Sequence, residues 1–145
     1  MISGNILILN KNPEERALLD KLCGKIGTVH SSSNLERAIS FLESIDFNVL
    51  VVDCSLASYA SLKGLLEKPV SIIITGSEEK RIKEIINEWP LNRYLDYHII
   101  LLDERDEKAF LRVLKKAAEH TLLKMEVENL IHYIERTKVE IKDAY

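Results

Sequence analysis

The sequence predicts an α/β protein: a five-stranded parallel sheet, doubly wound by helices on both faces, with an extended C-terminal helix. Three observations lead to this class. Short runs rich in apolar residues alternate with helical patterns along the chain. Most of these runs are apolar without polar alternation, which is typical of parallel strands covered on both faces. The chain has 145 residues, 46% of them hydrophobic, which is enough for one domain with a substantial core.

The first strand and the first helix carry their own boundary signals. Residues 5–10, NILILN, form an apolar run that predicts a buried strand. Pro13 suits the first turn of a helix, and Asn12 before it can accept hydrogen bonds from the first helical amides as an N-cap. The helical pattern stops at Gly24. We therefore expect a strand, a tight turn and a helix in this part of the chain.

The next unit repeats this order with weaker signals. A less apolar strand is expected at residues 27–31, and either Ser33 or Asn34 can cap the helix that follows. The third strand, Val49–Asp53, has a run of apolar residues that ends on a carboxylate. This aspartate either closes the strand in solvent or is held at the edge of the sheet for a function.

The second half of the chain continues the alternation and ends in a long helix. A fourth strand is expected at Val70–Thr75, a charged amphipathic helix at residues 78–89 and a fifth strand at residues 98–102. From about Glu107 the pattern is helical to the last residue, Tyr145. Strands and helices that alternate in this way favour a doubly wound sheet.

Polar residues stand at the carboxyl ends of four predicted strands. They are Asn10 and Lys11 after the first strand, Asp53 at the end of the third, Thr75 at the end of the fourth and Asp103 after the fifth. Doubly wound sheets place their functional sites beyond the carboxyl ends of their strands. These residues are therefore the candidate site.

Taken in order, stretches of residues 5–118 resemble those of a CheY-like response-regulator receiver domain. The stretches are ILILNKNPEERALLDKL, DFNVLVVDCSL, SIIITGS and HIILLDERDEKAFLRVL. The resemblance implies the flavodoxin-like receiver fold and a place in two-component signal transduction or a phosphorelay, without enzymatic activity of the domain's own.

The resemblance implies roles for two residues and a departure from the family at three others. Asp53 lies where the family has its phosphoryl-accepting aspartate, and Thr75 lies where a hydroxyl contacts that phosphoryl group. Asn10 and Lys11 lie where the family has acidic residues that hold Mg²⁺, and Asp103 lies where it has a lysine. The chain is thus similar to an atypical, degenerate member of the family, a pseudo-receiver.

These departures change the electrostatics of phosphoryl transfer. A divalent cation and a lysine offset the repulsion between a phosphoryl group and its acceptor carboxylate, and Mg²⁺ needs oxygen ligands. We therefore expect a module that works without Mg²⁺, other cofactors or phosphorylation. A conventional receiver that uses Asp53 and Mg²⁺ is the alternative. Lys11 either pairs with Asp53 in place of the metal or points into solvent.

The last helix is longer than a receiver-like domain needs. We expect that domain at residues 1–119 and a helical coiled-coil linker at residues 120–145. Apolar residues recur in the linker at alternating spacings of four and three, which is a heptad seam: Leu123, Val127, Leu130, Ile134, Thr137 and Ile141. The seam lies on a different side of the helix from the apolar residues that precede it in the same helix and are expected to face the sheet. We expect it to pair with a second copy in a parallel homodimer, and folding back onto the domain is the alternative.

The chain ends within the helical pattern, which suggests a fragment that an output domain follows. The ending ERTKVEIKDAY is similar to linkers that join receivers to HD-GYP, GGDEF or histidine kinase domains. The resemblance also implies an upstream histidine kinase or another signalling protein as a partner.

Charge, hydropathy and cysteine content bear on the partners, the location and the metal sites that can be expected. A net charge of −3 argues against nucleic acid as a partner. No apolar run is long enough for a membrane span and no secretory signal is visible, so a cytoplasmic location is expected. Cys23 and Cys54 lack metal-ligand spacing and are expected to be reduced and mostly buried, with no metal site. A flavodoxin-like ligand-binding domain or a small enzyme is a further alternative, although the sequence has no glycine-rich phosphate loop.

Overall fold

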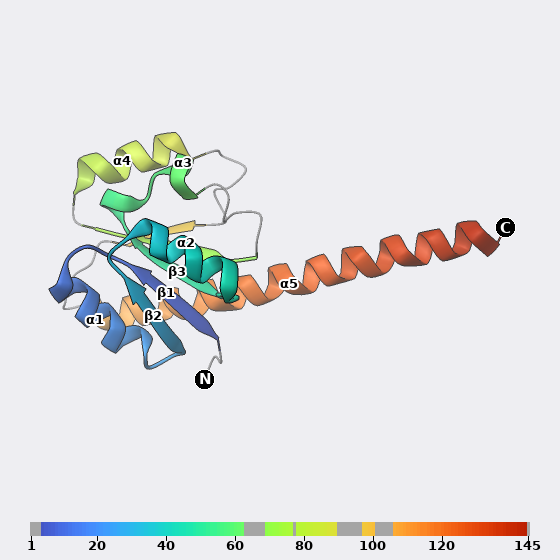
Figure 1. The fold of residues 1–145 in the computed structure, drawn as a ribbon, viewed down its shortest axis with the longest axis horizontal. Coiled ribbons are helices and arrows are strands. Elements are labelled where there is room, and N and C mark those ends of the chain that lie inside the picture. Colours follow the sequence, from blue (N-terminus) through green and yellow to red (C-terminus); the bar gives the residue numbers. More distant parts are fainter. Residues whose placement is uncertain (1–3, 63–68, 77, 90–96, 101–105, 145) are drawn as a thin grey trace.

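Five parallel strands form one sheet in a computed structural model that describes residues 4–62, 69–76, 78–89, 97–100 and 106–144 (Figure 1). The order across the sheet is β2-β1-β3-β4-β5, and every neighbouring pair is parallel. The strands are β1 (Asn5–Leu9), β2 (Thr28–Ser32), β3 (Val49–Asp53), β4 (Ser71–Thr75) and β5 (Tyr97–Ile100). The predicted parallel five-stranded sheet is therefore confirmed.

Helices connect the strands and cover both faces of the sheet, as Figure 1 shows. They are α1 (Pro13–Cys23), α2 (Leu35–Ser44), α3 (Tyr59–Leu62), α4 (Glu79–Glu88) and α5 (Glu107–Ala144), with a short 3-10 helix, η1 (Cys54–Leu56), after β3. The single-turn α3 was not predicted, because four residues are too few to show a helical period. The doubly wound arrangement and the long final helix are as the sequence predicts.

Two separate apolar clusters hold the layers together, one on each face of the sheet. On one face, side chains of α1 and α5 such as Leu19 and Leu114 pack on Ile8 and Val51. On the other face, side chains of α2, α3 and α4 pack on the alternate strand residues; examples are Leu42, Leu62 and Ile85 on Leu50 and Ile74. Successive strand residues are thus buried on opposite faces, which explains the apolar runs without alternation.

Local signals set the helix starts that position the loops at the edge of the sheet. The Asn12 side chain accepts hydrogen bonds from the amides of Glu14 and Glu15, and Pro13 opens α1 as predicted. Of the two candidates for the second cap, Asn34 is the one used, since its side chain accepts from the Glu36 amide.

The observed bounds differ from the predicted ones by one residue at several strands. β2 covers residues 28–32 instead of 27–31, β4 begins at Ser71 and β5 begins at Tyr97. Residues 101 and 102, the predicted end of the fifth strand, lie outside the described residues.

Helix α5 is joined to the sheet by a buried threonine that sequence reasoning passed over. Thr121 is fully buried, and its hydroxyl donates to the backbone oxygen of Asn48 at 2.5 Å and is hydrogen-bonded to the Ser71 hydroxyl at 2.8 Å. Three residues later, the Lys124 ammonium donates to the Val70 oxygen at 3.4 Å. These contacts tie the helix to the amino ends of β3 and β4. The division of the chain after residue 119 stays a prediction.

Beyond this joint, α5 runs on as a single helix that projects far from the layered part of the molecule (Figure 1). Of the helices in the described part of the chain, α5 included, none has the length and hydropathy that a membrane span requires.

Replacing Thr121 by valine tests the joint. Thr121→Val keeps the shape but removes the donor to the Asn48 oxygen, so we expect the free energy of unfolding to fall by about 1–3 kcal/mol in urea denaturation. The matched change Thr28→Val, at an exposed position of β2, is expected to alter it by less than about 0.5 kcal/mol. Equal effects of the two substitutions would contradict the conclusion that the Thr121 hydroxyl joins α5 to the sheet.

Candidate functional site

The carboxyl ends of β1, β3 and β4 bring three of the predicted site residues to one edge of the sheet. Asp53 ends β3 and Thr75 ends β4, and the two are paired in register. Leu9 ends β1 beside Val52, so Asn10 follows at the same edge. The strand register therefore places Asn10, Asp53 and Thr75 side by side along this edge.

The Asp53 carboxylate caps the turn that follows it. Its Oδ2 accepts a hydrogen bond from the Ser55 amide at 3.1 Å and another from the Ser55 hydroxyl. These bonds open η1, with Asp53 as its N-cap, and Asp53 itself is half-buried. The Asp53 carboxylate therefore closes strand β3 by capping the turn that follows it.

Thr75 is buried beside Asp53 with an unused hydroxyl. Only 1% of the residue is exposed, and within the described structure its Oγ1 has no hydrogen-bond partner. A buried hydroxyl without a partner costs about 1–3 kcal/mol. The next residue, Gly76, has φ of 155°, and a Cβ there would collide with the Cys54 sulfur, so the close approach of this loop to η1 requires glycine.

The polar groups of the Asn10 side chain are hydrogen-bonded within the loop and the helix that follow β1. Its Oδ1 accepts from the Asn12 amide at 2.8 Å, and its Nδ2 donates to Glu15 Oε2 at 3.1 Å. Its backbone oxygen accepts from the Arg16 guanidinium at 2.9 Å. With 1% exposure and these partners, Asn10 holds the loop in place.

Of the two alternatives for Lys11, the structure has the one in which it points into solvent, and the pairing with Asp53 is not formed. Lys11 is exposed, and within the described residues the ion pairs are those of Arg81 with Glu84 and Glu88. The reason is local: the Asp53 carboxylate turns toward Ser55, while Lys11 extends into solvent.

The residues at this edge offer Mg²⁺ a poor set of ligands. Asn10 Oδ1 is already an acceptor in the loop, and the neighbouring Lys11 carries a positive charge. Asp53 is the one carboxylate among the three residues of the edge, and its Oδ2 is bound by Ser55. Across the residues that the structure describes, no group of three or more His, Cys, Asp and Glu side chains could hold a metal ion. These residues do not fit the magnesium site of a receiver domain.

Both cysteines are free and buried, as predicted. Burial, and after it the negative charges of Asp53 and Glu78, raises the pKa of the Cys54 thiol. Burial, with Asp20 nearby, raises the pKa of the Cys23 thiol to about 12. Both thiols therefore stay protonated at neutral pH, which is the unreactive form.

Arg81 of α4 contacts the site, although sequence reasoning did not select it. Its Nε donates to the Cys54 backbone oxygen at 3.1 Å, and its guanidinium pairs with Glu84 at 3.1 Å and Glu88 at 3.3 Å. It links η1, next to Asp53, to α4. The spacing of Arg81 and Glu84 on one helix face was the available signal, but the contact with Cys54 depends on tertiary structure.

The predicted seam of α5 is a stripe of largely exposed apolar side chains. The exposed fractions are 57% for Leu123, 54% for Val127, 58% for Leu130 and 44% for Ile134. Thr137 is half-buried, with its hydroxyl donating to the Tyr133 oxygen at 2.9 Å. The side chain of Ile141 and the whole of Asp103 lie outside what the structure describes.

The seam lies on the side of α5 opposite to the sheet. The buried stripe of α5 is Phe110, Leu114, Ala117, Ala118 and Thr121. With 3.6 residues per turn, the centre of the seam is rotated by about 150° from this stripe. The change of face occurs next to Thr121, so the seam is out of phase with the buried stripe, as predicted.

Replacing Thr75 by valine tests the unpartnered hydroxyl. Thr75→Val exchanges a buried hydroxyl for a methyl group, so we expect the free energy of unfolding to rise by about 1 kcal/mol. This is the opposite sign to Thr121→Val, measured in the same urea titration. A loss of stability in Thr75→Val would mean that its hydroxyl has a partner.

No protein-family model and no curated protein sequence matches the chain. Solved structures do match. A signal receiver domain of an HD domain-containing protein from Pseudomonas fluorescens Pf-5 superposes with a TM-score of 0.67 at 18% identity, over 85% of this chain and 92% of that one. A CheY-like response-regulator receiver domain from Methylobacillus flagellatus has a TM-score of 0.60 at 12% identity, over 79% and 98%.

A third similar structure contains a coiled coil. It is a trimeric coiled-coil segment of yeast Spc42 fused to another protein, with a TM-score of 0.65 at 13% identity, over 99% of this chain and 97% of that one. The likeness to the two receiver domains extends over most of both chains in each case. The chain therefore has the fold of a CheY-like response-regulator receiver domain, with a long C-terminal helix added.

Proposed function

We propose that the chain is a non-catalytic signalling module: a receiver-like domain that works without Mg²⁺ or phosphorylation and pairs with a second copy through α5. The observation that carries the proposal is the exposed apolar seam on a helix that projects from the domain. Isolated exposed apolar residues are normal, but a continuous stripe at heptad spacing favours a partner helix.

The residues of the seam favour a two-stranded parallel coiled coil. In heptad notation the a positions are Val127, Ile134 and Ile141, and the d positions are Leu123, Leu130 and Thr137. β-Branched residues at a with leucine at d favour two strands over three or four. The composition therefore supports a dimer over the trimer described for the Spc42 fusion.

Charges beside the seam support the parallel direction. In a parallel pair, Glu119 at a g position faces Lys124 of the partner subunit at an e position, which is an attractive pair. The antiparallel alignment that covers the whole seam instead places Lys124 opposite the partner's Lys138, and Glu126 opposite the partner's Glu140. Both contacts are repulsive.

The position of the seam leaves room for two domains. Since it faces away from the sheet, a partner helix would lie on the free side of α5, and the two domains would lie on opposite outer sides of the pair. The joint at Thr121 would then fix each domain relative to the coiled coil.

The proposed role of the coiled coil is to pass the state of the domain to an output domain. The similar structure from Pseudomonas fluorescens is the receiver domain of an HD domain-containing protein, which supports an arrangement of this kind. An upstream histidine kinase or another signalling protein would act on the domain. We place the module in the cytoplasm, where such partners are found.

A substitution within the seam tests the dimer. Light scattering after gel filtration is expected to give twice the 16.6 kDa chain mass for the parent protein. Leu130→Asp puts a charge between the helices, and we expect it to give monomers. Asn129→Asp adds the same charge one residue away from the seam and is expected to stay dimeric.

A monomeric parent protein at tens of micromolar, or a parent of three times the chain mass, would contradict the proposed dimer. So would an Asn129→Asp variant that dissociates as completely as Leu130→Asp, because the effect would then come from charge alone.

Phosphoryl acceptance by Asp53 is the second candidate function. One observation favours it: the unpartnered Thr75 hydroxyl lies in register beside Asp53, where it could contact an added phosphoryl group. Against it, the residues at the edge do not fit Mg²⁺, and Lys11 lies in solvent.

Intact mass spectrometry after incubation with acetyl phosphate and Mg²⁺ separates the two candidates. We expect the mass of the parent protein to stay unchanged, because no divalent cation would offset the repulsion at Asp53. Gain of one phosphoryl group by the parent, and its absence in Asp53→Asn, would establish the second candidate instead.

A further inference from the structure

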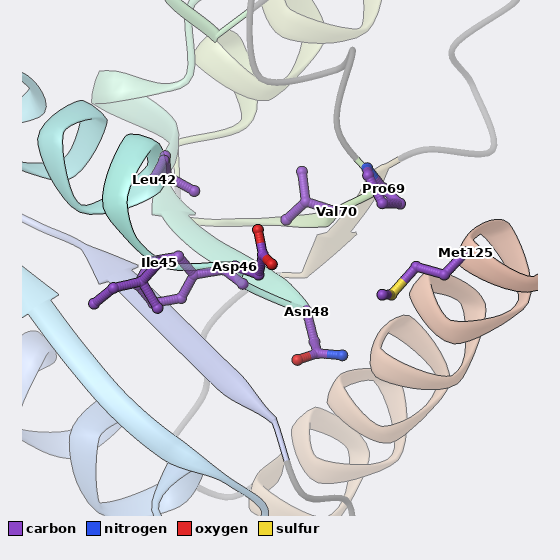
Figure 2. A pocket seen from close by; sticks show the side chains of 8 residues that line it. Leu42, Ile45, Asp46, Asn48, Pro69, Val70 and Met125 are labelled. Carbon is purple, nitrogen blue, oxygen red and sulfur yellow. The ribbon is translucent and has the colours of Figure 1, made fainter. Parts of the chain in front are cut away.

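A pocket of about 220 Å³ lies at the amino ends of β3 and β4, where α5 leaves the domain (Figure 2). This is the opposite end of the sheet from Asp53 and Thr75. Its walls come from α2, from the segment between α2 and β3, from the start of β4 and from α5. None of the functions discussed above uses it.

The pocket combines apolar walls with one carboxylate. Leu42, Ile45, Phe47, Val70 and Met125 supply the apolar surface. In Figure 2 the Asp46 side chain stands between Leu42, Val70 and Met125. The second polar residue of the lining, Asn48, uses its Oδ1 to accept from the Asn5 amide at 3.1 Å.

The Asp46 carboxylate has no ion pair within the described part of the chain. Only its backbone oxygen is hydrogen-bonded, by Asn5 Nδ2 at 3.1 Å. The nearby Lys124 ammonium donates to the Val70 oxygen and does not pair with Asp46. Among the described residues no cation is paired with the Asp46 carboxylate, which thus leaves a negative charge at the border of an apolar pocket.

We propose that this pocket binds a small organic cation with an apolar body, such as an aryl- or alkylammonium compound. The ammonium group would pair with Asp46, and the body would lie against Leu42, Val70 and Met125. The volume is suitable: a dry cavity of about 150 Å³ holds benzene, so this pocket has room for a ring and a carbon that carries the ammonium group. An anion of the same shape would be repelled by Asp46.

Because Met125 belongs to α5 and the other walls belong to the domain, a bound cation would contact both parts of the joint. Binding would therefore stabilise α5 in the direction that the Thr121 contacts set. A ligand at this site would therefore act on α5 directly, without a change at the edge of the sheet near Asp53.

Amide and methyl NMR spectra of the full chain, titrated with three probes of one shape, test the proposal. Benzylammonium is expected to shift the Asn48 side-chain amide, the Val70 amide and the Met125 methyl group, with saturation at millimolar concentrations. Benzyl alcohol, which lacks the charge, should bind about fivefold more weakly. Benzoate should cause no shifts at these residues.

Two variants complete the test. Asp46→Asn should remove the preference for benzylammonium over benzyl alcohol and leave a folded protein, because the Asp46 side chain is exposed and makes no hydrogen bond to a residue that the structure describes. Glu43→Gln, a change of the same charge on the exposed side of α2, should keep the preference. The proposal is overturned by absence of shifts with benzylammonium, by equal affinity for the alcohol, or by an equal effect of the two variants.

Discussion

The arrangement of this molecule depends on how α5 divides its surface between the sheet and solvent. Its first four turns bury Phe110, Leu114 and Ala117 against the sheet, and the last buried residue, Thr121, is hydrogen-bonded to the amino ends of β3 and β4. From Leu123 onward the residues of the seam lie on the other side of the helix. Thr121 joins the helix to the domain between its buried face and its exposed seam. The pocket beside Met125 lies next to this joint.

At the edge of the sheet near Asp53, most polar side chains are hydrogen-bonded to backbone groups of the neighbouring loops. Apart from Thr75 and the exposed Lys11, the polar residues there hold backbone: Asp53 caps η1, Asn10 holds the loop after β1, and Arg81 ties η1 to α4. These contacts are hydrogen bonds between protein groups. The Thr75 hydroxyl is the buried exception, and it is why phosphoryl acceptance stays the second candidate.

The elements that were predicted correctly are those whose bounds depend on residues close together in the sequence. The bounds of α1 follow from Asn12, Pro13 and Gly24, and β3 follows from its apolar run, so these elements match the structure closely. The neighbouring positions of Asp53 and Thr75 were predictable because parallel strands end at one edge.

Features that depend on side-chain direction could not be predicted in this way. The sequence left open whether Lys11 pairs with Asp53 or points into solvent; the structure has it in solvent, and the Asp53 carboxylate is hydrogen-bonded to Ser55, two residues along the chain. Thr121 looks like any polar residue on a helix surface, and only the packed structure shows that it is buried. The pocket is formed by three stretches far apart in the sequence, residues 42–48, residues 69–70 and Met125, so no local motif predicts it.

The proposed parallel pairing of α5 is tested most directly by distance measurements between spin labels on two copies. Labels are attached to Leu122→Cys or Asn129→Cys, which occupy equivalent heptad positions; the native Cys23 and Cys54 are buried and their thiols stay protonated. A parallel pair predicts one short separation, the same for both sites. A much longer separation at residue 122 than at residue 129, as an antiparallel pair gives, or no measurable coupling at either site, would contradict the account.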